Sequence, residues 1–130
     1  MSSRHADLLL RLAVVGLLSG HAAVHGLSVG SRLGWSGAAP AGAADAAGAV
    51  LWFVAGLMVL DTAVLVAVRS RHWWALGGAA ALVSQVAVVS AWPDAWTGTV
   101  VNAAVLSACL HASTRASHGS GPTPAVLPRA

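Results

Sequence analysis

The sequence predicts an all-α fold, an integral membrane four-helix bundle with both the N and the C terminus in the cytoplasm. Of its 130 residues, 57% are hydrophobic and only 8% are charged, whereas a soluble domain carries about a quarter of its residues charged. Four apolar runs are long enough to cross a bilayer as helices. Arginines gather on one side of these runs, as the positive-inside rule expects of cytoplasmic segments.

The first two helices are predicted at about residues 8–29 and 46–68. Arginines precede the first run, as in a signal peptide, but its apolar stretch is too long and no small-x-small cleavage site ends it. We therefore expect a retained helix. The connection that follows, "WSGAAPAGAADAAG", is rich in small residues and is expected to be irregular.

The third and fourth helices are predicted at about residues 73–91 and 97–112. The short connection "RSRHWW" makes the second and third helices antiparallel neighbours. Pro93 ends the third helix, and Asp94 or Thr97 can cap the fourth. The transmembrane domain thus comprises residues 1–112. The tail, residues 113–130, is rich in Ser, Gly and Pro and is expected to be disordered in the cytoplasm.

Arginine and tryptophan positions agree on the orientation of the chain in the plasma membrane. The cytoplasmic side is predicted to hold Arg4, Arg11, Arg69, Arg71, Arg115 and Arg129, and Arg32 alone lies in an outer loop. Trp73 and Trp74 fall at the inner interface and the other tryptophans near the outer one. The arginines form no basic patch with interleaved aromatics, which argues against nucleic acid. Cys109 is the single cysteine and excludes an intramolecular disulfide.

The stretch "GHAAVHG" places two histidines within the first apolar run. His21 and His25 belong to a stripe of partly polar residues at three-four spacing that should face the bundle, because polar side chains in lipid are costly. We expect a polar pocket in the outer half of the membrane, formed by His21, His25, Gln85, Asp94 and Asn102. In the inner half, Asp61 is expected to form a structural ion pair with Arg11.

Two interpretations of the histidine pair stay open. His21 and His25 with Asp94 form a two-histidine, one-carboxylate set suited to a transition metal, iron or copper. Alternatively, each ring only hydrogen-bonds to Asn102, Gln85 or a carbonyl, which the sequence slightly favours. A zinc protease helix is excluded because Ala22, not glutamate, follows the first histidine.

The motif Trp92-x-Asp94-Ala95-x-x-Gly98-Thr99-x-x-Asn102 resembles that of an uncharacterised bacterial family of four-helix membrane modules. The likeness covers roughly residues 8–112 and includes the Ser84-Gln85 pair. In that family a soluble domain of unknown function often follows the module. The resemblance implies no established activity, but it directs attention to Asp94, Gly98, Thr99 and Asn102. Trp96 departs from it, standing where the family tends to have a basic residue.

The sequence therefore favours a non-enzymatic membrane protein, an accessory or small-ligand-binding module with its polar pocket in the outer leaflet. One alternative is a metal-dependent membrane oxidoreductase that uses His21, His25 and Asp94. A second is a small oligomeric transporter in which Asp61 titrates. The expected partners are the lipid bilayer and either other membrane-protein subunits or further copies of this chain.

Overall fold

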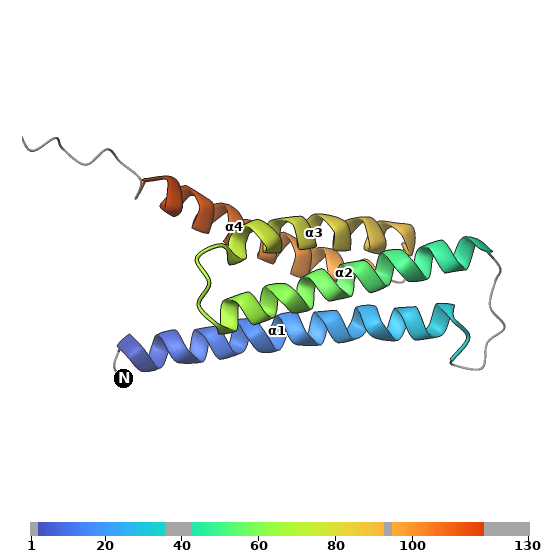
Figure 1. Cartoon of the computed structure of the whole chain (residues 1–130), viewed down its shortest axis with the longest axis horizontal. Helices are drawn as coiled ribbons and strands as arrows, with labels where there is room; N and C mark the ends of the chain where they lie inside the picture. Colours follow the sequence, from blue (N-terminus) through green and yellow to red (C-terminus); the bar gives the residue numbers. More distant parts are fainter. Residues whose placement is uncertain (1–2, 36–42, 93–94, 119–130) are drawn as a thin grey trace, which may run out of the picture.

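The computed structural model describes residues 3–35, 43–92 and 95–118. These residues form four α-helices and no strand, which confirms the all-α prediction. The helices are α1 (Ser3–Arg32), α2 (Ala43–Ala67), α3 (Trp73–Ser90) and α4 (Thr97–His118). Successive helices run in opposite directions, so the start of α1, the α2–α3 connection and the end of α4 lie at the same end of the molecule (Figure 1).

α2 begins three residues before its predicted start, at Ala43, and α1 and α4 extend further beyond the apolar runs that predicted them. α1 begins at Ser3 rather than near residue 8, and Arg11 reaches back one turn to Asp7 at 2.8 Å. α4 continues to His118 rather than ending near residue 112. There the hydroxyls of Ser113 and Ser117 bond to carbonyls three or four residues earlier. Polar side chains thus continue a helix that a hydropathy criterion ends too soon. Residues 119–130 of the predicted tail lie outside the described part.

The helices pack in chain order: α1 along α2, α2 against α3, and α3 against α4. α1 and α4 are at the two ends of this order and share no extended contact. The buried interfaces consist mainly of small residues, including Ala55 and Ala63 of α2 and Ala80 and Ala87 of α3. Small side chains let helix backbones approach closely, as is common in bundles that lack a water-driven core.

Gly56 sets the distance between α1 and α2. A Cβ atom at this position would lie 2.9 Å from the Cβ of His25 and 3.4 Å from the carbonyl oxygen of Ala22. Both neighbours belong to the body of α1 rather than to a flexible side-chain tip. Glycine at position 56 therefore allows α2 to lie against the turn of α1 that carries His25.

Both α1 and α2 end in a left-handed residue that satisfies the last free carbonyls. After α1 this residue is Gly34 (φ 77°), and the next amide, of Trp35, bonds to the carbonyl of Gly30. After α2 it is Arg69 (φ 59°), and the amide of Ser70 bonds to the carbonyl of Leu65. Glycine adopts this conformation without cost, whereas arginine does so against a steric penalty.

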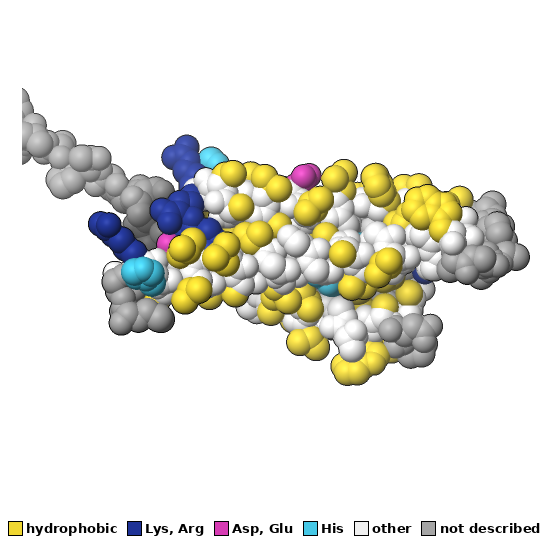
Figure 2. Space-filling view, turned by 90° about the horizontal axis from the view of Figure 1, so that it is seen from below, with side chains coloured by type: hydrophobic (Ala, Val, Ile, Leu, Met, Phe, Trp, Pro, Cys, Tyr) yellow, Lys and Arg dark blue, Asp and Glu magenta, His cyan; other side chains and the backbone are white. Residues whose placement is uncertain are grey.

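By length and composition, three helices could cross a membrane: α1, residues 46–67 of α2, and α3. Large hydrophobic side chains are exposed along them, among them Leu10, Phe53 and Leu82. α4 has polar residues in its last turns and is not one of the three. Arginine side chains gather at one end of the molecule, beyond the apolar middle (Figure 2). This pattern suggests association with a membrane.

Candidate functional site

Side chains from three helices form one buried hydrogen-bonded network. His21 Nε2 lies 3.2 Å from both Ser84 Oγ and Asn102 Oδ1. His25 Nε2 lies 2.9 Å from the same Ser84 oxygen. Gln85 accepts a hydrogen bond from Asn102 at 3.1 Å and donates one to Thr99 at 3.1 Å. The network thus ties α1 to both α3 and α4 through polar groups only.

One arrangement of the imidazole protons satisfies every contact of the network. Asn102 donates through its amide nitrogen to Gln85, so its oxygen accepts and His21 must donate from Nε2. Ser84 can accept from His21 and donate its own proton to Nε2 of His25. That arrangement places the proton of His25 on Nδ1. Both rings are neutral in it, which suits a site away from water.

Two buried nitrogen atoms next to the network have no hydrogen-bond partner among the described residues: His25 Nδ1 and Trp52 Nε1. The two side chains are 1% and 3% exposed. Their ring centroids are 4.9 Å apart, and the ring of His21 packs edge-on against His25 at 4.8 Å. With its proton on Nδ1, His25 presents an N–H donor, as the indole of Trp52 always does. An unmet donor in a buried site costs about 1–3 kcal/mol.

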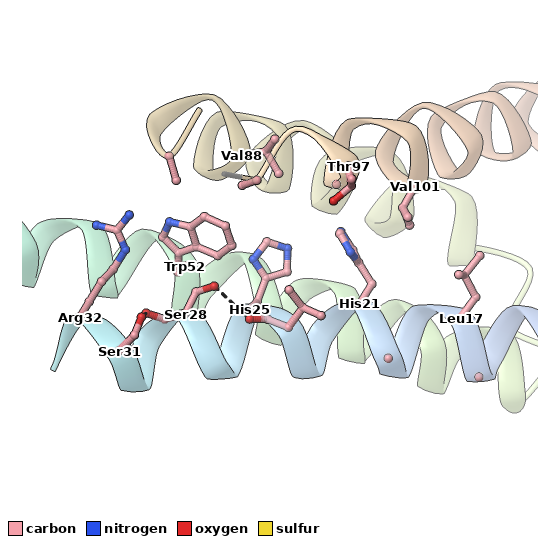
Figure 3. A pocket seen from close by; sticks show the side chains of 16 residues that line it. Leu17, His21, His25, Ser28, Ser31, Arg32, Trp52, Val88, Thr97 and Val101 are labelled. Atoms are coloured by element: carbon pink, nitrogen blue, oxygen red, sulfur yellow. Dashed lines mark hydrogen bonds between the residues drawn. The ribbon is translucent and has the colours of Figure 1, made fainter. Parts of the chain in front are cut away.

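His21, His25 and Trp52 line a groove of about 660 Å³ between α1 and the α3–α4 side of the molecule. In Figure 3 the side chains of His21, His25 and Ser28 project from α1 into this space, and those of Val88, Thr97 and Val101 face them. The groove is open along one side, since Leu17 and Val24 of its wall are about half exposed. It has the volume of an ordinary small-molecule site.

The groove is polar at one end and apolar at the other. Ser28, Ser31 and Arg32 line it near the end of α1, while Leu17 and Val101 line it toward the middle of the molecule. The Arg32 guanidinium carbon lies 5.8 Å from the ring centroid of Trp52, within the range of a cation–π contact. Such a wall suits a ligand with a polar head and an apolar body.

Two glycines widen the groove instead of packing helices together. Gly16 and Gly20 have the four-residue spacing that often allows close helix contact, yet a Cβ atom on either would meet nothing within 4 Å. Both line the groove. Gly98 is the close-contact glycine of this region, because a Cβ there would lie 2.7 Å from Val88 and 3.7 Å from the ring of His21.

Four of the five predicted pocket residues meet in the network: His21, His25, Gln85 and Asn102. The fifth, Asp94, lies outside the described residues, and so does the complete His21–His25–Asp94 metal set. Within the described part of the chain, no three His, Cys, Asp or Glu side chains are grouped as metal ligands would be.

The structure does not bring Asp61 and Arg11 together. Arg11 pairs with Asp7, the acid one helical turn before it, and Arg69 approaches the same carboxylate at 3.4 Å. Asp61 lies on the exposed face of α2. Helical spacing explains the difference, because a partner four residues away is already in reach, whereas Asp61 points away from α1.

Sequence reasoning missed the central role of Ser84 and the place of Trp52. Ser84 is fully buried and, among the described residues, it alone bonds to both histidines. One signal was available: small residues at positions 77, 80, 81, 84 and 87 form a stripe along α3, and all of them are buried. A serine within such a stripe has its hydroxyl directed at a neighbouring helix.

The comparisons with known proteins add no relative. No protein-family model matches the chain. No curated protein and no solved structure matches it either.

Proposed function

We propose that this chain is an integral membrane module that binds a small ligand in the groove between α1 and α4. The observation that carries the proposal is that His21 and His25 line that groove and are held in place by hydrogen bonds to Ser84 and Asn102. Such a network positions hydrogen-bond donors in an apolar surrounding, which is how most small-molecule sites obtain specificity. The Ser84 hydroxyl is within hydrogen-bond distance of both histidines, but it is 0% exposed and does not line the groove, which favours binding over nucleophilic catalysis.

The membrane setting rests on the apolar surfaces of α1, α2 and α3 and on the distribution of arginine. The exposed arginines Arg4, Arg69, Arg71 and Arg115 belong to elements at one end of the bundle, and Arg32 to the other. By the positive-inside rule, both termini then face the cytoplasm and the groove opens in the outer leaflet. α4 would be the fourth span, as in the motif-defined family that the sequence resembles.

A variant that fills the groove tests the proposal. Gly20 lines the groove and has open space around its Cβ position, so Gly20→Leu should occupy the site without disturbing the fold. Gly26→Leu is the matched control, because it also has open space but lies outside the groove. We expect organic extracts of the purified wild type and of Gly26→Leu to contain the same stoichiometric small molecule by mass spectrometry. We expect the Gly20→Leu extract to lack it.

The same samples decide between binding and its alternatives. Identical extracts from wild type and Gly20→Leu would contradict the groove as a binding site. The metal-dependent oxidoreductase is a second candidate, because two imidazole nitrogens converge on one atom, Ser84 Oγ. It predicts stoichiometric iron or copper by elemental analysis, lost in a His21→Ala/His25→Ala double variant.

A further inference from the structure

We infer that the outward face of α2 around Asp61 docks a membrane helix of another protein, and that this helix carries an arginine or lysine at the level of Asp61. Asp61 lies within the apolar run of α2, residues 46–67, and its side chain is exposed. A carboxylate that faces lipid is costly unless a partner covers it. The docking surface needs the membrane setting of the proposed function but not its groove, so either can fail without the other.

Asp61 lies at the middle level of the bundle. The next residue, Thr62, lines a small internal cavity together with His21 and Asn102 of the network. The end of α2 at Ala67 is six residues further on, which is about 9 Å at 1.5 Å per residue. Long lysine and arginine side chains can carry their charge over such a distance to the membrane surface, but the short aspartate side chain cannot. The carboxylate must therefore be satisfied at the level where it lies.

No described residue forms a hydrogen bond or an ion pair with Asp61. Arg11 and Arg69 both contact the carboxylate of Asp7 instead, at 2.8 and 3.4 Å. Arg69 follows Asp61 by eight residues, about 12 Å along a helix. The chain has no lysine, and its other described arginines belong to the ends of α1 and α4 and to the α2–α3 connection. The cation that pairs with Asp61 must come from outside the chain.

A second copy of this chain does not supply that cation. The positive-inside rule gives every copy the same orientation, so Asp61 of one copy would meet the level of Asp61 in the other. At this level each copy offers an acid and a buried neutral network, while its arginines lie toward the ends of the helices. Two acids brought together repel each other. The occupant that fits is a different helix with a basic residue in its apolar middle.

The surface around Asp61 has the pattern that a partner helix needs. Five exposed residues of α2 follow one another at alternating four- and three-residue spacing: Val50, Val54, Leu57, Asp61 and Val64. This Asp61 stripe stays in line with a neighbouring helix over its whole length, and one polar position within it fixes the register. A lipid molecule is a poorer fit, because its charged groups stay in the head-group layer, about 15 Å from the middle of the bilayer.

The test uses two synthetic transmembrane peptides of leucine and alanine, one with arginine at its central position and the other with leucine there. Their association with the full-length protein in lipid vesicles is measured by fluorescence energy transfer. We expect wild type to bind the arginine peptide about tenfold more tightly than the leucine peptide, the effect of one charge-assisted hydrogen bond. Asp61→Asn keeps the size of the side chain and should abolish most of this preference. Asp61→Glu keeps the charge and should retain it.

A second pair of variants tests the Asp61 stripe apart from its charge. Leu57→Trp places a bulky ring one helical turn from the acid and should weaken binding of the arginine peptide. Leu82→Trp, at an exposed position of α3, is the matched control and should leave binding unchanged. Gly20→Leu should also bind the peptide like wild type, because it changes the groove and not this surface.

Three results would overturn the inference. The first is equal binding of the two peptides by wild type, and the second is an unchanged preference in Asp61→Asn. The third is association between differently labelled copies of wild type that is lost in Asp61→Asn, because a second copy would then cover the surface in place of a basic partner.

Discussion

Ser84→Ala is the most informative change in the network, because one oxygen atom serves both histidines. The hydroxyl lies 3.2 Å from Nε2 of His21 and 2.9 Å from Nε2 of His25, and the residue is 0% exposed. After the change, His21 keeps Asn102 at 3.2 Å. His25 loses the one hydrogen bond found for its ring and keeps none among the described residues, since its Nδ1 is already without a partner.

These contacts set the expected loss of stability. Hydrogen bonds between transmembrane helices average about 0.6 kcal/mol and reach about 1.7 kcal/mol. The His21 contact belongs at the low end, because Asn102 still accepts from the ring. The His25 contact belongs at the high end, because the ring becomes a buried polar group without a partner. Together they give about 2 kcal/mol, which is about a 30-fold change in the folding equilibrium constant.

The assay is reversible unfolding in mixed micelles, with the fraction of SDS as the denaturing variable. Ser107→Ala is the matched control, since that serine is exposed and bonds only to a carbonyl of its own helix. The control should change the free energy of unfolding by less than about 0.5 kcal/mol. Equal unfolding curves for the two variants would refute the network as a source of stability.

A double-mutant cycle tests the assignment to His25. In a His25→Phe background, Ser84→Ala no longer leaves an imidazole without a hydrogen bond. The loss in the free energy of unfolding should then fall to the smaller value assigned to the His21 contact. The coupling energy between the two changes should then be about 1.4 kcal/mol. Additive effects would mean that Ser84 acts through packing, and the proton arrangement inferred for the two rings would lose its basis.

Three further variants probe the packing and the helix ends. Gly56→Ala should destabilise the protein by about 1–3 kcal/mol in the same unfolding assay, because its Cβ would press on the body of α1 at His25. Gly26→Ala, with open space around it, should be neutral or slightly stabilising; an equal loss in both would contradict the close-contact argument. Arg69→Gly should raise the free energy of unfolding by up to about 1 kcal/mol, because glycine adopts the positive φ of this position without strain. A lower free energy of unfolding would mean that the contact of Arg69 with Asp7 contributes more than the strain costs. Cys109 is 3% exposed, so its thiol should react with N-ethylmaleimide only after SDS unfolding; rapid labelling of the native protein would contradict its burial.

Much of the fold follows from apolar run length, and the site follows from helical spacing on α1. His21 and His25 are four residues apart, so they had to share a face, and that face is buried. Gln85 and Asn102 were expected beside them because amides in apolar helices need partners. Ser84 could not be singled out in this way. Serine is common in this sequence, and the choice of partner depends on the rotation of α3 about its axis.

The expected Asp61–Arg11 pair shows where sequence reasoning reaches its limit. The pair was predicted from the depth expected for the two residues in the membrane, and depth does not say which way a side chain points around its helix. The guanidinium of Arg11 lies 2.8 Å from the carboxylate of Asp7 on the same helix, and Asp61 is exposed on the outside of the bundle. A proton-carrying role for Asp61 would therefore act at the surface of the bundle, not in its polar interior.

The order of packing explains why a polar network and an open groove occur together. A closed four-helix bundle would bring α1 against α4 and fill the space beside His21 with side chains. Here α2 and α3 lie between the two outer helices in the packing order. Gly16 and Gly20 place no side chain on the face of α1 that lines the groove. α1 and α4 meet at the 3.2 Å contact of His21 with Asn102 and where Gly98 approaches the His21 ring. The contact between the two outer helices thus lies directly behind His21, which lines the groove, so a ligand that bridges the same two helices would stabilise the fold as it binds.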